Sequence, residues 1–131
     1  MPLLVVPLLL SSLLTGCSSL DKRNRMSQLD TAVRQYARAI RWERFEVAQS
    51  LIRPRTEAPP ENPIDMPEMD VTADESRIVN ISPNGNEAVV DYSFEYVLDR
   101  QNRTRHTTQQ VLWYWDEKAD RWFIDGSLPK F

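Results

Sequence analysis

The fold is decided by the stretch NGNEAVVDYSFEYVL, at residues 84–98. Asn84-Gly85 is the strongest short signal for a β-hairpin, because the tight turns of hairpins require positive φ angles. After this turn, apolar residues occupy every second position, at Val90, Tyr92, Phe94, Tyr96 and Leu98. Asp91 and Glu95 lie between them. A period of two predicts a strand with one face toward a core and the other toward solvent.

Further strands are predicted on both sides of this stretch. Strand character begins at Val71, and residues 77–81 are predicted to pair with the strand that follows the Asn-Gly turn. The pattern continues with a turn at 99–102, a strand at 107–115, a turn at 116–120 and a strand at 121–125. Four strands joined in sequence by short turns predict an antiparallel meander.

Helical spacing precedes the strands. One apolar set comprises Leu29, Val33, Tyr36, Ala37 and Ile40, and a second set comprises Phe45, Ala48 and Ile52. Ser27 followed by Asp30 is a weaker relative of the capping box, so the helix is predicted to begin near Ser27. The two sets do not share one straight stripe, which predicts a bend or break near residues 41–43. Pro54 is predicted to end the helical region.

These patterns together predict the α+β class. A long amphipathic helix or a helix pair is expected to cover one face of a four-stranded antiparallel sheet. The 131 residues suit one domain, predicted at residues 26–131. Residues 53–70 hold five of the nine prolines and are predicted to be a connector. This connector is either an extended surface linker or an ordered lid or partner-binding arm.

The order of elements resembles the cystatin-like and nuclear transport factor 2-like superfamily across residues 26–131. The resemblance is carried by AIRW at 39–42, FEVA at 45–48, and the aromatic strands around Trp113 and Trp122. In that superfamily, N-terminal helices pack into the concave face of a curved sheet, and the same packing is expected here. The superfamily includes enzymes, carriers and adaptors, so the resemblance implies no single function.

The N-terminal residues differ in character from the rest. Residues 1–14 contain no charged side chain, are too short to span a bilayer, and include two prolines that disfavour a core helix. They lead into Leu14-Thr15-Gly16-Cys17, which resembles the lipobox of bacterial lipoproteins. The positively charged start that is usual in signal peptides is missing. Cys17 is the only cysteine, and the alternative interpretation is a buried, inert side chain.

The lipobox resemblance implies a signal peptide at residues 1–16, cleavage after Gly16, and lipid on the sulfur and the new amine of Cys17. Residues 17–25 are then expected to be the lipidated cysteine and a polar tether. Two or more acyl chains attach a protein lastingly to a membrane. In Gram-negative lipoproteins an aspartate after the cysteine typically causes retention in the inner membrane. Ser18 therefore implies the periplasmic face of the outer membrane.

Charge is spread unevenly along the chain. Residues 21–55 carry a net charge of +5 and residues 57–99 a net charge of −10, although the whole chain has only −3. The small total gives no reason to expect nucleic acid as a partner. The segments either attract each other within an ordinary solvated fold, or the basic stretch at 22–25 lies near anionic lipid headgroups.

No complete catalytic set is recognisable. His106 is the only histidine, so the chain lacks a Cys/His metal-binding cluster, and phosphate or dinucleotide motifs are also missing. Some isomerases of the resembling superfamily place a tyrosine and two acids in the cone. Tyr36 with Asp91 or Asp125 is the nearest counterpart, but no motif maps these residues onto the isomerase site. We therefore expect no enzyme activity, no cofactor and no metal.

The aromatic residues are the remaining candidates for binding. They are Trp42, Tyr92, Phe94, Tyr96, Trp113, Trp115 and Trp122. The strand aromatics either form the core beneath the helix or line a cavity for a small apolar ligand. Part of this face, or an exposed Trp42, is alternatively an anchor for another envelope protein. The expected function is a non-enzymatic binding or accessory module, and the alternative is a pocketed domain that binds or isomerises a small apolar molecule.

Overall fold

The computed structural model describes residues 16–56, 65–98 and 102–131, with side chains from Leu20 onward. Residues 1–15 of the predicted signal peptide and the predicted lipid site on the Cys17 side chain lie outside what it describes, as does the middle of the predicted connector. Two helices are present, α1 at Gly16–Arg41 and α2 at Phe45–Ser50. Four strands follow: β1 at Met69–Ile81, β2 at Glu87–Leu98, β3 at Thr104–Asp116 and β4 at Arg121–Asp125.

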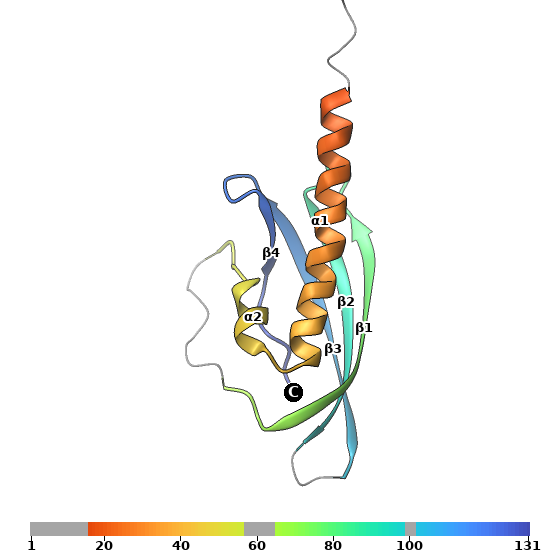
Figure 1. Cartoon of the computed structure of the whole chain (residues 1–131), viewed down its shortest axis with the longest axis vertical. Helices are drawn as coiled ribbons and strands as arrows, with labels where there is room; N and C mark the ends of the chain where they lie inside the picture. Colours follow the sequence, from red (N-terminus) through yellow and green to blue (C-terminus); the bar gives the residue numbers. More distant parts are fainter. Residues whose placement is uncertain (1–15, 57–64, 99–101) are drawn as a thin grey trace, which may run out of the picture.

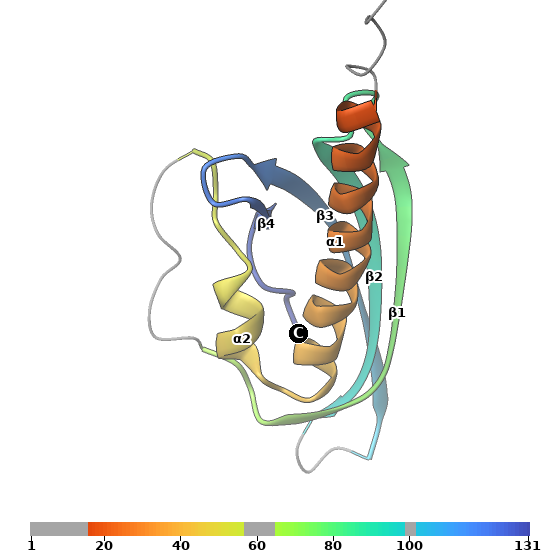
Figure 2. The same ribbon diagram turned by 45° about the horizontal axis from the view of Figure 1, so that its top comes forward.

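The strands form one antiparallel sheet in the order β1-β2-β3-β4. Figure 1 shows α1 lying along one face of this sheet, and Figure 2 shows the strands bending around it with α2 beside the end of α1. The predicted α+β class and the helix pair on one sheet face are confirmed. The arrangement is consistent with a fold of the cystatin-like or nuclear transport factor 2-like kind.

The alternation predicted for β2 is confirmed. Its residues alternate between buried and half-buried, and the buried side chains are Ala88, Val90, Tyr92, Phe94 and Tyr96. The opposing face of α1 contributes Leu29, Val33, Tyr36, Ala37 and Ile40, each at most 4% exposed. Residues that recur every 3.6 positions on the helix and every second position on the strand thus pack together in one core. The predicted apolar faces are the faces that pack.

The predicted break between the helices is also confirmed, and its geometry is that of a Schellman motif. The N–H of Glu43 donates to the Ile40 carbonyl at 3.0 Å, and the N–H of Arg44 donates to the Ala39 carbonyl at 2.8 Å. Glu43 has a φ of 55°, the left-handed conformation that this motif requires. The Glu43 carboxylate accepts the Val71 N–H of β1 at 2.9 Å, which ties the turn to the sheet.

Several predicted boundaries were wrong. β3 begins at Thr104 and not at Thr107, and α2 ends at Ser50, before Pro54. Two differences are larger. α1 begins at Gly16 and not near Ser27, so the residues expected to form a polar tether, 17–25, are helical. β1 begins at Met69, inside the predicted connector, because its first residues pair with the end of β2, Met69 opposite Leu98. Strand pairing extends β1 beyond its local sequence signal, and contacts at Lys22 and Arg25 join part of the added length of α1 to the sheet.

Residues 51–55, which we call the strap, run along the open edge of β4. Ile52 forms a parallel bridge with Ile124. The N–H of Arg53 donates to the Ile124 carbonyl at 2.8 Å, and the N–H of Ile124 donates to the Leu51 carbonyl at 2.8 Å. The backbone groups of Ile124 that face the sheet edge are therefore satisfied, as buried strand groups need to be.

Candidate functional site

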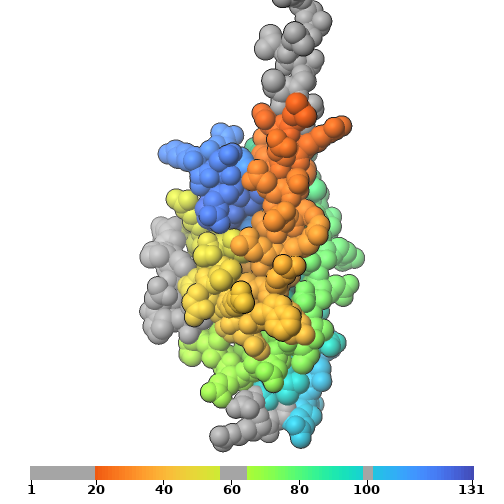
Figure 3. Space-filling view, viewed as in Figure 1, coloured from red at the N-terminus to blue at the C-terminus, as the bar shows by residue number. Residues whose placement is uncertain are grey.

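Cys17 is the second residue of α1. The first turns of α1 extend beyond the end of the sheet, as Figures 1 and 3 show. With 26 residues at about 1.5 Å each, α1 is about 39 Å long, so its two ends lie far apart. The helix therefore separates Cys17 from the break at Glu43.

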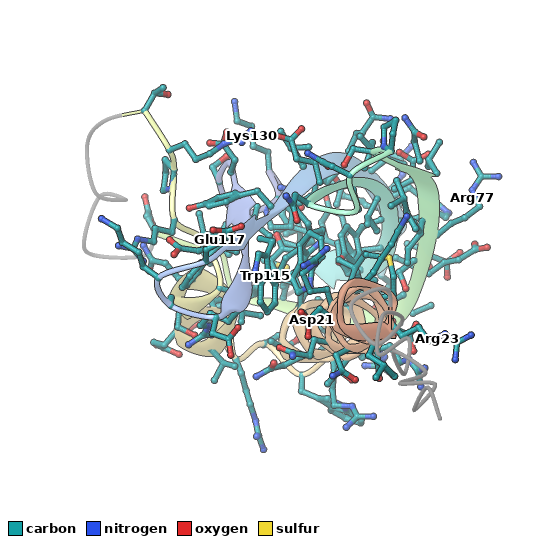
Figure 4. All side chains as sticks on the ribbon, turned by 90° about the horizontal axis from the view of Figure 1, so that it is seen from above. Asp21, Arg23, Arg77, Trp115, Glu117 and Lys130 are labelled. Carbon is teal, nitrogen blue, oxygen red and sulfur yellow. The ribbon has the colours of Figure 1, made fainter. Side chains whose placement is uncertain are left out.

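After its first turns, α1 is hydrogen-bonded to the sheet and to the β1–β2 turn. Trp122 of β4 donates its indole N–H to the Arg25 carbonyl at 2.8 Å. The Lys22 ammonium group reaches the Pro83 carbonyl in the β1–β2 turn at 3.5 Å. Asp21 and Arg23, labelled in Figure 4, lie on the projecting part of α1 with exposed side chains. The end of α1 near Cys17 is thus a continuation of the packed helix.

The strand aromatics form the core and not an open pocket. Their exposed fractions are Tyr92 1%, Phe94 0%, Tyr96 5%, Trp113 0% and Trp122 2%. Trp115 is half-buried and packs edge-on against Trp122, with ring centroids 5.7 Å apart. Trp42 is separate from this cluster and is 62% exposed. The structure therefore groups six of the seven predicted aromatic residues and leaves Trp42 on the surface.

Two tyrosine hydroxyls lie inside this core and are hydrogen-bonded there. Tyr92 donates to the Val33 carbonyl at 3.2 Å and accepts the Trp113 indole N–H at 3.2 Å. Tyr36 donates to the side-chain oxygen of Gln109 at 2.8 Å. Burial raises the pKa of both tyrosines well above the usual value, because it disfavours the phenolate. Both hydroxyls are therefore neutral structural groups at ordinary pH.

Residues 127–131 close the remaining side of the concave face. Gln109 donates to the Ser127 carbonyl at 2.6 Å, and Thr107 donates to the Lys130 carbonyl at 2.7 Å. The Phe131 ring meets the Tyr96 ring edge-on at a centroid distance of 5.0 Å. Residues 127–131 therefore cover this side of the aromatic core.

Tyr36, Asp91 and Asp125, the nearest counterpart of an isomerase site, do not lie together. Asp91 lies toward the outer face of the sheet, where it accepts from Gln110 at 2.9 Å and pairs with Arg77 at 3.5 Å. Figure 4 shows Arg77 projecting away from the sheet. Asp125 pairs with Arg55 at 3.2 Å. Neither acid hydrogen-bonds to Tyr36.

His106 is a surface residue paired with Glu95. Its Nε2 lies 3.2 Å from a Glu95 carboxylate oxygen, and the histidine side chain is 63% exposed. Within residues 16–56, 65–98 and 102–131, no group of three or more His, Cys, Asp or Glu side chains is placed to hold a metal ion. The contact joins exposed side chains of β2 and β3 that face each other in the sheet register.

A charged cluster that the sequence did not reveal lies over β2, β3 and β4. Arg55 donates to Glu87 at 2.8 Å and to Asp125 at 3.2 Å, and its guanidinium lies 4.9 Å from the Tyr114 ring centroid. These carboxylates raise the pKa of Arg55, with the Glu87 hydrogen bond as the main cause. The partners are far apart in the chain, so no local motif indicates the cluster. Arg55 thereby links the strap of residues 51–55 to β2 and β4.

Comparisons with known proteins add no family. No protein-family model matches the chain, and no curated protein is significantly similar to it in sequence. Among the described residues, neither helix has the length and apolar character needed to cross a bilayer.

Proposed function

We propose that this chain is a bacterial envelope lipoprotein, anchored by lipid on Cys17 and acting as a non-enzymatic binding or accessory module in the periplasm. The observation that carries the proposal is the lipobox, Leu14-Thr15-Gly16-Cys17, which follows an uncharged apolar stretch. Ser18 after the cysteine favours the outer membrane. Lipid on both sulfur and amine makes attachment lasting, since each buried methylene contributes about 0.8 kcal/mol.

The position of Cys17 in the fold supports this proposal. It lies at the projecting end of α1, away from the sheet (Figure 1), so an attached lipid would enter a bilayer without disturbing the core. Lys22 and Arg23 are exposed on the same part of the helix. Each basic residue near an anionic membrane surface adds about 1 kcal/mol of attraction.

The closed core supports binding through the surface of the domain. A pocket for a small apolar ligand needs a concave apolar cavity. Here the aromatic face of the sheet is covered by α1 and by residues 127–131, and Trp113 and Phe94 have no exposed surface. The alternative, an apolar ligand site or isomerase, has no comparable support among the described residues.

The first experiment is expression of the full chain and of Cys17→Ser in a Gram-negative host, followed by membrane fractionation and mass spectrometry of the N-terminal peptide. The proposal predicts a mature chain that begins at Cys17 with three acyl groups and floats with the outer membrane. The Cys17→Ser variant is expected to retain residues 1–16 and to carry no acyl group. An uncleaved or unmodified wild-type N-terminus would overturn the proposal.

A second experiment tests the accessory role. In vivo crosslinking and affinity capture from solubilised membranes, with Cys17→Ala as control, should recover defined envelope proteins only with the lipidated form. Equal recovery with both forms would make the anchor unnecessary for binding. If neither form recovers a protein but the purified chain retains a small apolar molecule, the alternative function replaces the accessory role.

A further inference from the structure

A surface hollow of about 400 Å³ lies between the end of α1 and α2. It is lined by Gln35, Arg38, Ala39, Trp42, Arg44 and Val47, and we call it the α1–α2 groove. Figure 3 shows the end of α1 and α2 side by side on the face of the molecule away from the sheet. The groove is distinct from the aromatic core and from the Cys17 end of α1.

The groove is lined by one large aromatic side chain, that of Trp42, and by the small side chain of Ala39 among others. Gln35, Arg38, Ala39 and Trp42 are spaced i, i+3, i+4 and i+7, so they form one stripe along α1. Val47 faces this stripe from α2 and is 39% exposed. Trp42 and Val47 are two of the five large hydrophobic residues that are exposed in the described part of the chain. Exposed aromatic side chains of this kind are favoured anchors at interfaces.

The Trp42 ring is held in position before any partner arrives. The Arg41 guanidinium lies 4.8 Å from the ring centroid, and it also donates a hydrogen bond to the Val71 carbonyl of β1. Arg41 therefore links the indole ring to the sheet. An anchor that is already ordered loses less conformational entropy on binding.

The groove is positively charged. Arg38 and Arg44 are exposed, and neither forms an ion pair with a described residue. The nearest acid in sequence, Glu43, has its carboxylate engaged by the Val71 N–H. Glu46 lines a separate hollow with Met66 and Met69. Two arginines beside an exposed indole make a surface suited to carboxylates next to an apolar side chain.

We infer that the α1–α2 groove is a docking site for an acidic polypeptide segment of a partner protein. An apolar side chain of the segment packs between Trp42 and Val47, and flanking Asp or Glu carboxylates pair with Arg38 and Arg44. The charge complementarity of the groove and the preformed Trp42 wall carry this assignment. For its biological role it rests on the proposed accessory function.

A membrane surface is a poorer occupant of the same groove. Trp42 follows the last residue of α1, and Cys17 is the second, so about 37 Å of helix separates them. If lipid on Cys17 fixes the projecting end at a bilayer, the groove lies at the far end of the helix. It is then presented to the periplasm, where a protein segment can reach it.

The test uses the full chain in zwitterionic detergent and a displayed library of random peptides of about twelve residues. We expect recovered sequences to be enriched in Asp and Glu around a Leu, Ile or aromatic residue. Their affinity should fall about tenfold or more in Trp42→Ala and in the double variant Arg38→Glu/Arg44→Glu. It should also fall with added salt, because the carboxylate–arginine pairs are exposed. Arg103→Glu, an exposed arginine elsewhere, is the matched control and should bind normally.

Several results would overturn the assignment. One is that the selection recovers no acid-rich peptides, and another is that acid-rich peptides bind all variants equally. A third is complete competition by phosphatidylglycerol vesicles, which would show that the groove binds anions of any kind. Circular dichroism of each variant ensures that a loss of binding is not a loss of fold. The same selection with Cys17→Ala separates the two proposals: peptide binding that persists without the lipid supports the groove even if the anchor fails.

Discussion

The indole N–H of Trp113 donates to the hydroxyl oxygen of Tyr92 at 3.2 Å, and that hydroxyl donates to the Val33 carbonyl at 3.2 Å. This chain of two hydrogen bonds links β3 to β2 and then to α1 inside the core. The Tyr36 ring packs edge-on against the Tyr92 ring at a centroid distance of 5.0 Å. Tyr92 therefore fixes the helix on the sheet at one defined position.

Replacement of Tyr92 by phenylalanine is expected to destabilise the fold by about 1–3 kcal/mol, because the Trp113 N–H is left buried without an acceptor. Urea unfolding followed by circular dichroism measures the change. Tyr96→Phe is the control, since Tyr96 is also buried and its hydroxyl makes no hydrogen bond to a described residue. Equal effects of the two substitutions would show that the Tyr92 hydrogen bonds contribute little.

Alkaline pH is expected to unfold the protein. Burial raises the pKa of Tyr36 and Tyr92 above the ordinary value of 10.0, so the folded chain keeps these protons while the unfolded chain loses them. Their contribution to stability is complete below pH 10.0 and is lost progressively as the pH rises above it. Tyrosinate absorbance recorded with circular dichroism should show both groups ionising only together with unfolding. Ionisation of all tyrosines before loss of structure would contradict this.

Two turn residues should respond to substitution with opposite signs. Gly85 has a φ of 72°, and an added Cβ would lie 3.2 Å from the Lys22 side chain, so Gly85→Ala should destabilise by about 1–2 kcal/mol. Asp120 also has a positive φ, 55°, but is exposed. Asp120→Gly should therefore stabilise slightly, by about 0.5 kcal/mol. Thermal unfolding of both variants measures the signs. A stabilising Gly85→Ala would mean that the turn relaxes to another conformation.

Removal of the Arg55 guanidinium should loosen the strap at 51–55 without unfolding the domain. The side chain is 40% exposed, so Arg55→Gln should change global stability by less than about 1 kcal/mol. Amide exchange at Arg53 and Ile124, whose N–H groups join the strap to β4, should become faster. Arg34→Gln, which breaks an exposed pair within α1, is the control. Unchanged exchange at both amides would show that the backbone bridge alone holds the strap.

The local patterns predicted the elements that carry their own signal. Asn84-Gly85 marks the β1–β2 turn, and alternation from Val90 identifies the buried face of β2. The mismatch of the two apolar sets predicted the break now seen at Glu43. These features depend on side-chain period and turn chemistry, both of which act over a few neighbouring residues.

The boundaries and contacts that were missed depend on residues far apart in the chain. The first half of α1 has no apolar stripe to indicate a helix, but Trp122 hydrogen-bonds to the Arg25 carbonyl across 97 positions. The start of β1 depends on its pairing with the end of β2. The Arg55 cluster and the α1–α2 groove likewise arise only when separate elements meet.

The sequence by itself determined the α+β class, the apolar faces of helix and sheet and the break between the helices, because each depends on the spacing of neighbouring residues. The lipobox resemblance at Cys17 also rests on local sequence and stays a prediction. The tertiary structure decided that the strand aromatics fill a closed core and that Trp42 stays exposed beside two arginines. The physical reason is that burial depends on which surfaces meet in three dimensions. The sequence around a tryptophan looks the same whether its side chain is buried beneath another element or exposed to solvent.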